Sequence, residues 1–226
     1  MKIVIATDKH LKYANIICET IDRSAEDRGT GIAKRTPEYI ETKIKNGNAV
    51  IALDNNKFAG FCYIEVFSNK SYVVHSGLIV HFDFRKQGLA KKIKAKVFNY
   101  SKERYPDAKV FGITTGLAVM KINYELGYKP VTFSELTDDP DFWKGCQTCK
   151  NYDVLKRTDQ KMCLCTGMLY DPKHKDDIRK HPYDKRLLGR LKRIKQSLFL
   201  KKNKKKENKK HTLLPLFFWK NKTNRL

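Results

Sequence analysis

The most constraining feature of this 226-residue chain is a junction between a strand-like run and a helix-like run. The apolar run Leu78-Ile79-Val80 is followed by the loop Arg85-Lys86-Gln87-Gly88-Leu89-Ala90, and Lys91 lies in the first turn of the next helix. Such a loop directs successive backbone N–H groups outward at the positive end of a helix, which suits a pyrophosphate. Gly88 leaves room there, because a Cβ atom would hold the phosphate away.

Strand and helix patterns alternate through the first 172 residues. Runs of β-branched and apolar residues predict strands at 2–6, 49–53, 58–67, 72–80, 109–114 and 128–133. Helical spacing predicts helices at 9–28, 88–104 and 117–126, and Thr36-Pro37-Glu38 opens a further helix with Thr36 as its N-cap. Short turns join the second to fourth strands as an antiparallel meander. The predicted fold class is therefore mixed α/β, in which a meander feeds alternating helices and strands.

Charge divides the chain into three predicted segments. Lys and Arg number 47 against 24 Asp and Glu, and 20 of the former but only 4 of the latter follow Pro172. We expect a folded domain at 1–172, a basic amphipathic helix at 173–200 and a disordered lysine-rich tail at 201–226. The tail either stays solvated or binds polyanions weakly, such as nucleic acid or an anionic membrane surface. No apolar run near the start is long enough for a secretory signal or a membrane span, so we expect a cytoplasmic protein.

Two segments resemble the GNAT acyltransferase superfamily. The run from Arg85 to Ala90 is similar to motif A of that family, Arg/Gln-x-x-Gly-x-Gly/Ala, and the run Ala118 to Tyr128 resembles motif B. More narrowly, 28–40 and 131–172 resemble a bacterial subgroup associated with arginine biosynthesis, whose members are thought to acylate glutamate. The resemblance implies a GNAT fold and acetyl-CoA as donor. It places the pyrophosphate on the backbone of 85–91 and the thioester carbonyl beside Leu78, Ile79 and Val80 on a splayed fourth strand.

The chain departs from the family pattern where many members have a tyrosine that protonates the leaving thiolate. That position is Asn123, and Tyr124 lies next to it on another face of the helix. An amide can donate a hydrogen bond to a thiolate but cannot protonate it. Acyl transfer to an ammonium also needs a base, for which Glu65 and His75 on the third and fourth strands are the candidates. A solvated carboxylate and a core-edge imidazole are the structural alternatives for these two residues.

Three cations in one loop are candidates for binding the acceptor. Arg28, Lys34 and Arg35 flank Gly29-Thr30-Gly31, where GNAT domains commonly bind acceptors. Arginine pairs with a carboxylate through two parallel hydrogen bonds, as an acidic amino acid would require. The alternative is that all three are solvated loop charges.

Four of the six cysteines fall within 20 residues. Cys146 and Cys149 precede Cys163 and Cys165, and a hairpin within the Cys-rich segment 143–170 would bring these pairs together. Four thiolates suit a tetrahedral metal, most often Zn²⁺, although an iron–sulfur cluster, reduced thiols with packing roles and redox pairing stay open.

Together these features predict an acyl-CoA-dependent N-acetyltransferase that acts on a small acceptor, with an amino acid such as glutamate favoured. A protein lysine or another amine is the alternative acceptor. The rival from another class is a non-catalytic nucleic-acid-binding module made of a metal knuckle and a basic arm. The acyl chain length and the oligomeric state are left open by the sequence.

Overall fold

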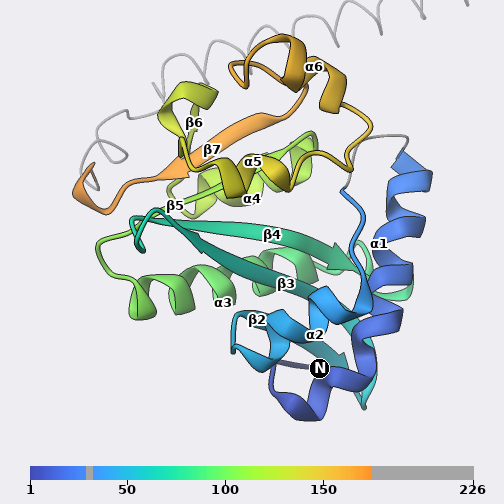
Figure 1. Ribbon diagram of the computed structural model, residues 1–226. Coiled ribbons are helices and arrows are strands. Elements are labelled where there is room, and N and C mark those ends of the chain that lie inside the picture. Colours follow the sequence, from blue (N-terminus) through green and yellow to red (C-terminus); the bar gives the residue numbers. More distant parts are fainter. Residues whose placement is uncertain (29–32, 175–226) are drawn as a thin grey trace, which may run out of the picture. The chain divides into compact units, whose positions relative to one another are not determined.

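The computed structural model describes residues 1–28 and 33–174 (Figure 1). The predicted tail at 201–226 lies outside these residues, as does the predicted helix at 173–200 apart from Lys173 and His174. None of the helices in the described ranges is long and apolar enough to cross a membrane.

Seven strands of the described chain form one sheet in the order β1-β2-β3-β4-β5-β7-β6. Their bounds are β1 Lys2–Ile5, β2 Ala49–Asp54, β3 Lys57–Phe67, β4 Tyr72–Val80, β5 Lys109–Thr114, β6 Lys129–Val131 and β7 Thr166–Tyr170. All neighbouring strands are antiparallel except β4 and β5. The predicted meander of β2, β3 and β4 and the mixed α/β class are confirmed.

Strands β4 and β5 separate along much of their length. Only Tyr72–Val74 of β4 pairs with β5, opposite Lys109–Phe111, although β4 continues to Val80. On its other side β4 carries an irregularity, because Tyr63 pairs with Ser76 and Phe61 pairs with Ile79. The sheet is therefore open between β4 and β5 beyond Val74.

Six α-helices lie in the described ranges: α1 Ala14–Arg28, α2 Pro37–Lys45, α3 Leu89–Arg104, α4 Leu117–Glu125, α5 Pro140–Lys144 and α6 Tyr152–Arg157. Helix α2 begins as predicted, since the Thr36 hydroxyl accepts a hydrogen bond from the Tyr39 amide at 3.3 Å and Pro37 occupies the first helical position. The predicted helix at 9–28 begins instead with a 3-10 turn at Asp8–Tyr13 and becomes α-helical only at Ala14.

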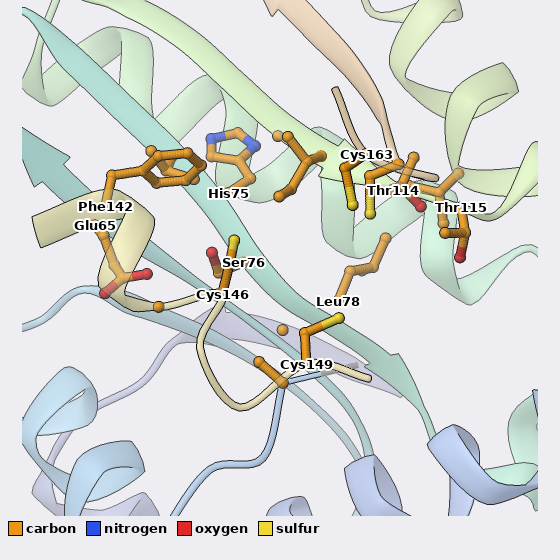
Figure 2. Close-up of a pocket in the computed structure, with 18 of the residues that line it drawn as sticks. Glu65, His75, Ser76, Leu78, Thr114, Thr115, Phe142, Cys146, Cys149 and Cys163 are labelled. Carbon is orange, nitrogen blue, oxygen red and sulfur yellow. The ribbon is translucent and has the colours of Figure 1, made fainter. Parts of the chain in front are cut away.

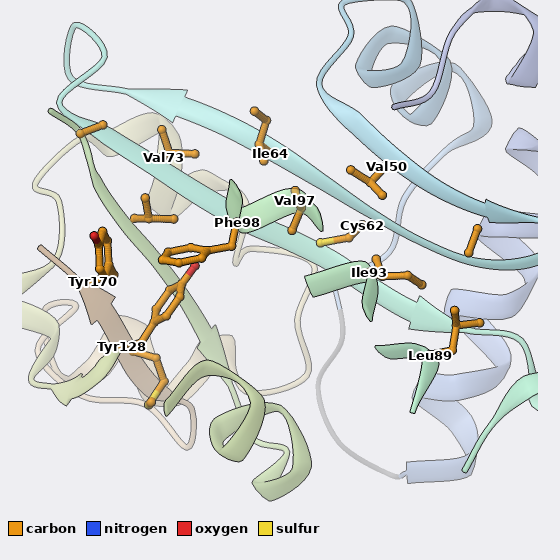
Figure 3. Close-up of a cluster of buried hydrophobic side chains, with 14 of the residues drawn as sticks. Val50, Cys62, Ile64, Val73, Leu89, Ile93, Val97, Phe98, Tyr128 and Tyr170 are labelled. Atoms are coloured by element: carbon orange, nitrogen blue, oxygen red, sulfur yellow. The ribbon is translucent and has the colours of Figure 1, made fainter. Parts of the chain in front are cut away.

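One face of the sheet is covered by α3. Its side chains Leu89, Ile93 and Val97 recur every four residues and pack on apolar side chains of β2, β3 and β4 (Figure 3). Phe98 and Tyr128 extend this core toward β7, with ring centroids 5.3 Å apart. Burial of this stripe is what fixes the start of α3 beside the end of β4.

The opposite face carries two separate apolar clusters. Helices α1 and α2 cover β2 and β3. Ile17 of α1, Ile40 of α2 and Phe61 of β3 belong to the cluster between them and are completely buried. The segment from β6 to β7 covers β5 through Phe142 and Trp143, which pack on Phe111 and Leu169. The two clusters flank the opening between β4 and β5 on this face.

The Cys-rich segment is not the predicted hairpin. It begins at the end of the short helix α5 and contains the short helix α6, and only its end is a strand, β7. In the strand order of the sheet, β7 lies between β5 and β6. It pairs with β5, where Gly112 is opposite Met168. The predicted strand at 128–133 is also shorter, because Phe133–Glu135 forms a 3-10 turn.

Candidate active site

A cavity of about 210 Å³ occupies the opening between β4 and β5 (Figure 2). Its rims are formed by Gly77 and Leu78 on β4 and by Thr114 at the end of β5. Side chains from both faces of the sheet line it: Arg35 and Glu65 from the α2 side, and Lys94 and Asn123 from α3 and α4. The cavity thus connects the two faces through the sheet, as the splayed fourth strand implied by the family resemblance requires.

The loop before α3 has the backbone geometry of an anion site. Gly88 is the N-cap of α3 and has φ 73° and ψ 7°, and Lys86 has φ 64°. No side chain caps the helix at Gly88, and the first-turn amides of an α-helix have no partner within the helix. A Cβ atom built on Gly88 meets no atom within 4 Å, so the space in front of the loop is open. The predicted phosphate loop therefore has free amide donors and room for a ligand.

Arg85 has a structural task in this loop. Its Nε donates to the carbonyl of Val80 at 3.2 Å and its guanidinium donates to the Ser24 hydroxyl at 2.7 Å. An ion pair of 3.6 Å joins it to Asp27. These contacts tie the loop to β4 and α1, so the side chain of Arg85 positions the loop and its backbone remains the part available to a phosphate.

The backbone of β4 at the rim is set by Gly77. This residue has φ +62°, and a Cβ atom there would lie 2.4 Å from the Tyr63 ring. Neither Gly77 nor Leu78 belongs to a residue pair with β3 or β5. The backbone at Leu78, predicted from the resemblance to face a thioester carbonyl, therefore lies at the cavity outside the strand ladder.

Glu65 lies in the cavity wall within a polar network. Its Oε1 accepts hydrogen bonds from the Tyr39 hydroxyl at 2.5 Å and from Lys43 Nζ at 3.1 Å. Among the described residues no hydrogen bond engages Oε2. The environment keeps Tyr39 protonated, because burial and then the charge of Glu65 and the Tyr63 hydroxyl raise the Tyr39 pKa. Glu65 is therefore a fixed carboxylate with one oxygen available to a ligand.

Of the two predicted acceptor cations whose side chains the structure describes, Arg35 lines the cavity and Lys34 does not. Its Nε donates to the Tyr63 hydroxyl at 2.6 Å, and one terminal nitrogen donates to the Lys34 carbonyl at 2.8 Å. Burial acts to lower the Arg35 pKa, but Tyr63, Tyr39 and Glu65 outweigh it and the pKa is raised, so the guanidinium keeps its charge. Lys34 is exposed, and the side chain of Arg28 lies outside the described part of the chain, as do 29–32.

His75 is held in the core, which argues against the predicted role as a base. The Ser101 hydroxyl donates to the Val97 carbonyl at 2.8 Å, so it accepts a hydrogen bond from His75 Nε2 at 2.9 Å. The other ring nitrogen of His75, Nδ1, accepts from the Tyr128 hydroxyl at 3.0 Å. Burial, followed by the nearby charge of Lys94, lowers the His75 pKa well below its usual value. His75 also lines the cavity, but both ring nitrogens are engaged and the ring is neutral, so its role as a base stays a prediction.

The two predicted catalytic residues of α4, Asn123 and Tyr124, lie in different environments. Asn123 is 1% exposed and lines the cavity, and its Oδ1 is the one buried side-chain oxygen of the described residues without a hydrogen-bond partner. Tyr124 is 56% exposed and lines a separate shallow depression with Met120 and Met168. The prediction of a catalytic Tyr124 is therefore not supported by its position.

Lys94 is the residue of the site that the sequence analysis missed. It is 2% exposed and lines the cavity from α3, with Nζ 5.3 Å from the centre of the Tyr128 ring. Burial lowers its pKa from 10.5 to about 8. The available signal was its spacing, since it lies three and four residues before Val97 and Phe98 on the apolar stripe of α3.

The four clustered cysteines line the cavity without forming the predicted metal site. In Figure 2, Cys146 and Cys149 extend from one loop and Cys163 comes from another segment. No group of three or more His, Cys, Asp or Glu side chains in the described ranges is arranged to hold a metal ion. Burial raises the pKa of Cys146 to about 11 and that of Cys165 to about 12, which favours protonated thiols. The prediction of zinc at Cys146, Cys149, Cys163 and Cys165 is therefore not supported by the described residues.

The sheet opens between its fourth and fifth strands, with a glycine loop at the start of α3, as the resemblance to the GNAT acyltransferases implies. Residues 18–118, which are less than half of the chain, match the family model described as the Acetyltransferase (GNAT) family. The matched segment contains the loop at 85–91 that resembles motif A. No curated protein matches the chain by sequence.

Solved structures of low identity share the fold. The N-acetylglutamate synthase of Neisseria gonorrhoeae, complexed with coenzyme A and N-acetyl-glutamate, has a TM-score of 0.54 and 16% identity. The match covers 75% of this chain but only 34% of the synthase, so this chain spans about a third of its length. Rv2747 of Mycobacterium tuberculosis, in complex with CoA, gives a TM-score of 0.56 at 12% identity and covers 76% of this chain and 99% of its own. The putative acetyltransferase yncA of Salmonella typhimurium, solved with acetyl-CoA, has a TM-score of 0.52 and 15% identity. The match covers 76% of this chain and 94% of yncA.

Proposed function

We propose that the protein transfers an acetyl group from acetyl-CoA to the amino group of a small acceptor that carries a carboxylate, with glutamate as the favoured acceptor. The observation that carries this proposal is the cavity itself. It brings a carboxylate, Glu65, and a guanidinium, Arg35, to one side of the opening whose other side is next to α3. An amino acid offers the complementary pair, an ammonium and a carboxylate.

The donor is supported by the loop at 85–91. Its glycine N-cap, free first-turn amides and open space suit the pyrophosphate of CoA. With the pyrophosphate there, the pantetheine arm extends into the opening beside Leu78. The backbone N–H groups at the Gly77–Leu78 rim would then polarise the thioester carbonyl and stabilise the oxyanion of the tetrahedral intermediate.

The acceptor side supplies the base and the anchor. Glu65 Oε2 would take a proton from the substrate ammonium, because Oε1 is already held by Tyr39 and Lys43. The free amine then attacks the carbonyl carbon. Arg35, fixed by its bond to Tyr63, would bind the acceptor carboxylate through its remaining N–H groups.

The subgroup associated with arginine biosynthesis is part of this proposal. It is supported by the resemblance of 28–40 and 131–172 and by the shared fold of the Neisseria synthase, which was solved with N-acetyl-glutamate. A protein lysine is a poorer match for the site, since a lysine side chain brings no carboxylate for Arg35.

The test compares Arg35→Gln with its neighbour Lys34→Gln in a steady-state assay of CoA thiol release. We expect Arg35→Gln to raise the apparent KM for glutamate about thirty- to several-hundred-fold with little change in the KM for acetyl-CoA, because one buried charge-assisted pair is lost. Lys34→Gln, which changes an exposed charge next to it, should alter either constant less than about two-fold. Equal effects of the two substitutions, or faster acylation of a simple alkylamine than of any amino acid, would refute the acceptor assignment.

A further inference from the structure

A buried cation faces the cavity without a protein anion to balance it. Lys94 is 2% exposed, and no carboxylate of the described residues forms an ion pair with it. A charged ammonium removed from water is costly unless it is paired. The structure therefore holds a cation that lacks its partner, at a place where a ligand would enter.

The titratable groups around Lys94 cannot supply that partner. Burial raises the pKa of the Cys62 thiol to about 11, and burial also raises the pKa of the Tyr128 phenol. His75, on β4, is kept neutral by burial and by Lys94 itself. All three neighbours are therefore uncharged at neutral pH, and the anion has to come from the ligand.

A second buried group in the lining of the same cavity, the side-chain oxygen of Asn123, also lacks a partner within the described chain. Asn123 on α4 is 1% exposed, and its Oδ1 is buried without a hydrogen-bond partner. An unsatisfied buried oxygen destabilises the protein, so it indicates a donor that is supplied by the ligand. Lys94 and Asn123 together form a pair of sites on the α3–α4 side, one for a negative or basic atom and one for a hydrogen-bond donor.

We propose that Lys94 is the general acid that protonates the leaving thiolate of CoA. This inference rests on the proposed function, which brings the thioester into the opening between β4 and β5. When the tetrahedral intermediate collapses, the carbon–sulfur bond breaks and its electron pair leaves on sulfur. The Lys94 ammonium gives one proton to that sulfur, which yields the free CoA thiol and a neutral Lys94 amine. The acceptor nitrogen, which becomes positive when it attacks, releases its second proton to solvent as the amide forms. Lys94 then regains a proton from solvent before the next turnover, while Asn123 Oδ1 accepts a hydrogen bond from the thiol formed.

The chemistry of the two groups is matched. A general acid works best when its pKa lies near the working pH, and burial places that of Lys94 at about 8. An unperturbed lysine, with a pKa of about 10.4, would hold its proton more tightly than a thiolate with a pKa of about 8.5. The position of Asn123 explains why another donor is needed, since an amide cannot protonate sulfur.

The decisive measurement is the pKa of the CoA thiol while it is bound to the enzyme, followed by thiolate absorbance in the ultraviolet. The complex with desulfo-CoA, which lacks the sulfur, supplies the baseline for the six protein cysteines. We expect Lys94→Met to raise the bound thiol pKa by about one to three pH units relative to wild type, because an adjacent cation is lost. Lys94→Arg should keep it low, and Lys96→Met, which alters an exposed lysine of the same helix, should match wild type.

Affinity for desulfo-CoA shows that each variant still folds and binds, since it probes the rest of the cofactor. In turnover, Lys94→Met should lower kcat about 100-fold or more without a comparable change in the KM for acetyl-CoA. If Lys94→Met binds CoA with an unchanged thiol pKa, or keeps kcat within about two-fold, the inference is wrong while the proposed function stands. If wild-type protein binds neither CoA nor desulfo-CoA, the proposed function fails and this inference fails with it.

Discussion

Replacing Lys94 by Met should stabilise the ligand-free protein at neutral pH. The side chains are similar in length, and the substitution removes a charge that is buried without an anion. Burial lowers the Lys94 pKa from 10.5 to about 8. This pKa difference corresponds to a free-energy cost of about 3 kcal/mol for folding the chain with Lys94 charged. Lys94→Met should therefore gain up to about that much in its free energy of unfolding at pH 7.

The gain should shrink as the pH rises. Below pH 8 the ammonium is charged in both the folded and the unfolded chain, so the folded protein carries the whole cost. Between about pH 8 and 10.5 the unfolded chain binds more protons at Lys94 than the folded chain, so wild-type stability rises with pH relative to the variant. From pH 7 to 9.5 the difference between the two proteins should narrow by about 2 kcal/mol.

Urea denaturation at several pH values between 7 and 9.5 measures this difference, with Lys96→Met as the control for loss of a surface charge. The control should track wild type within about 0.5 kcal/mol at every pH. A difference between Lys94→Met and wild type that is independent of pH would refute the reasoning, as would a variant several kcal/mol less stable than wild type at pH 7.

Two further predictions follow from the loop and the core. Gly88→Glu should abolish CoA binding in calorimetric titration while the circular dichroism spectrum stays native, because the side chain would enter the open space before α3. Gly88→Ala is the control for the positive φ at this position. Equal affinity for CoA in wild type and both variants would contradict the loop assignment. His75→Ala should lower the free energy of unfolding by about 2–4 kcal/mol because Tyr128 and Ser101 lose a buried partner. In wild type the depressed His75 pKa should make stability fall as the pH drops below about 6.5, where the unfolded imidazole takes up a proton; a loss of rate without a loss of stability in His75→Ala would contradict its placement in the core.

Local signals were enough for six of the seven strands but not for β7, which the sequence analysis did not predict. The bounds predicted at 72–80 and 109–114 agree with β4 and β5, because apolar and β-branched residues occupy most positions of both runs. Thr36 and the start of α2 also agree, since capping depends only on neighbouring residues. These features are encoded within a few positions of the chain.

Features that depend on tertiary placement could not be predicted in the same way. Lys94 is surrounded in sequence by other lysines, and only the packing of α3 on Tyr128 shows that it is buried. The spacing of Cys146 and Cys163 is compatible with a metal site, but with α5 before Cys146 and α6 between the two residues, the thiols line a shared cavity instead. The surroundings of His75 could not be predicted for the same reason, because nothing near it in sequence indicates the hydrogen bonds that occupy its ring.

The most direct test of acetyl transfer is a competition experiment on the full chain. Acetyl-CoA is incubated with the protein and an equimolar mixture of the common amino acids and a simple alkylamine, and mass spectrometry identifies the amine that gains an acetyl group. The account predicts an N-acetylated acidic amino acid, formed in step with free CoA and strongly reduced in Arg35→Gln. Acetylation of the alkylamine in preference to every amino acid, or no acetylated product although acetyl-CoA is bound, would contradict it.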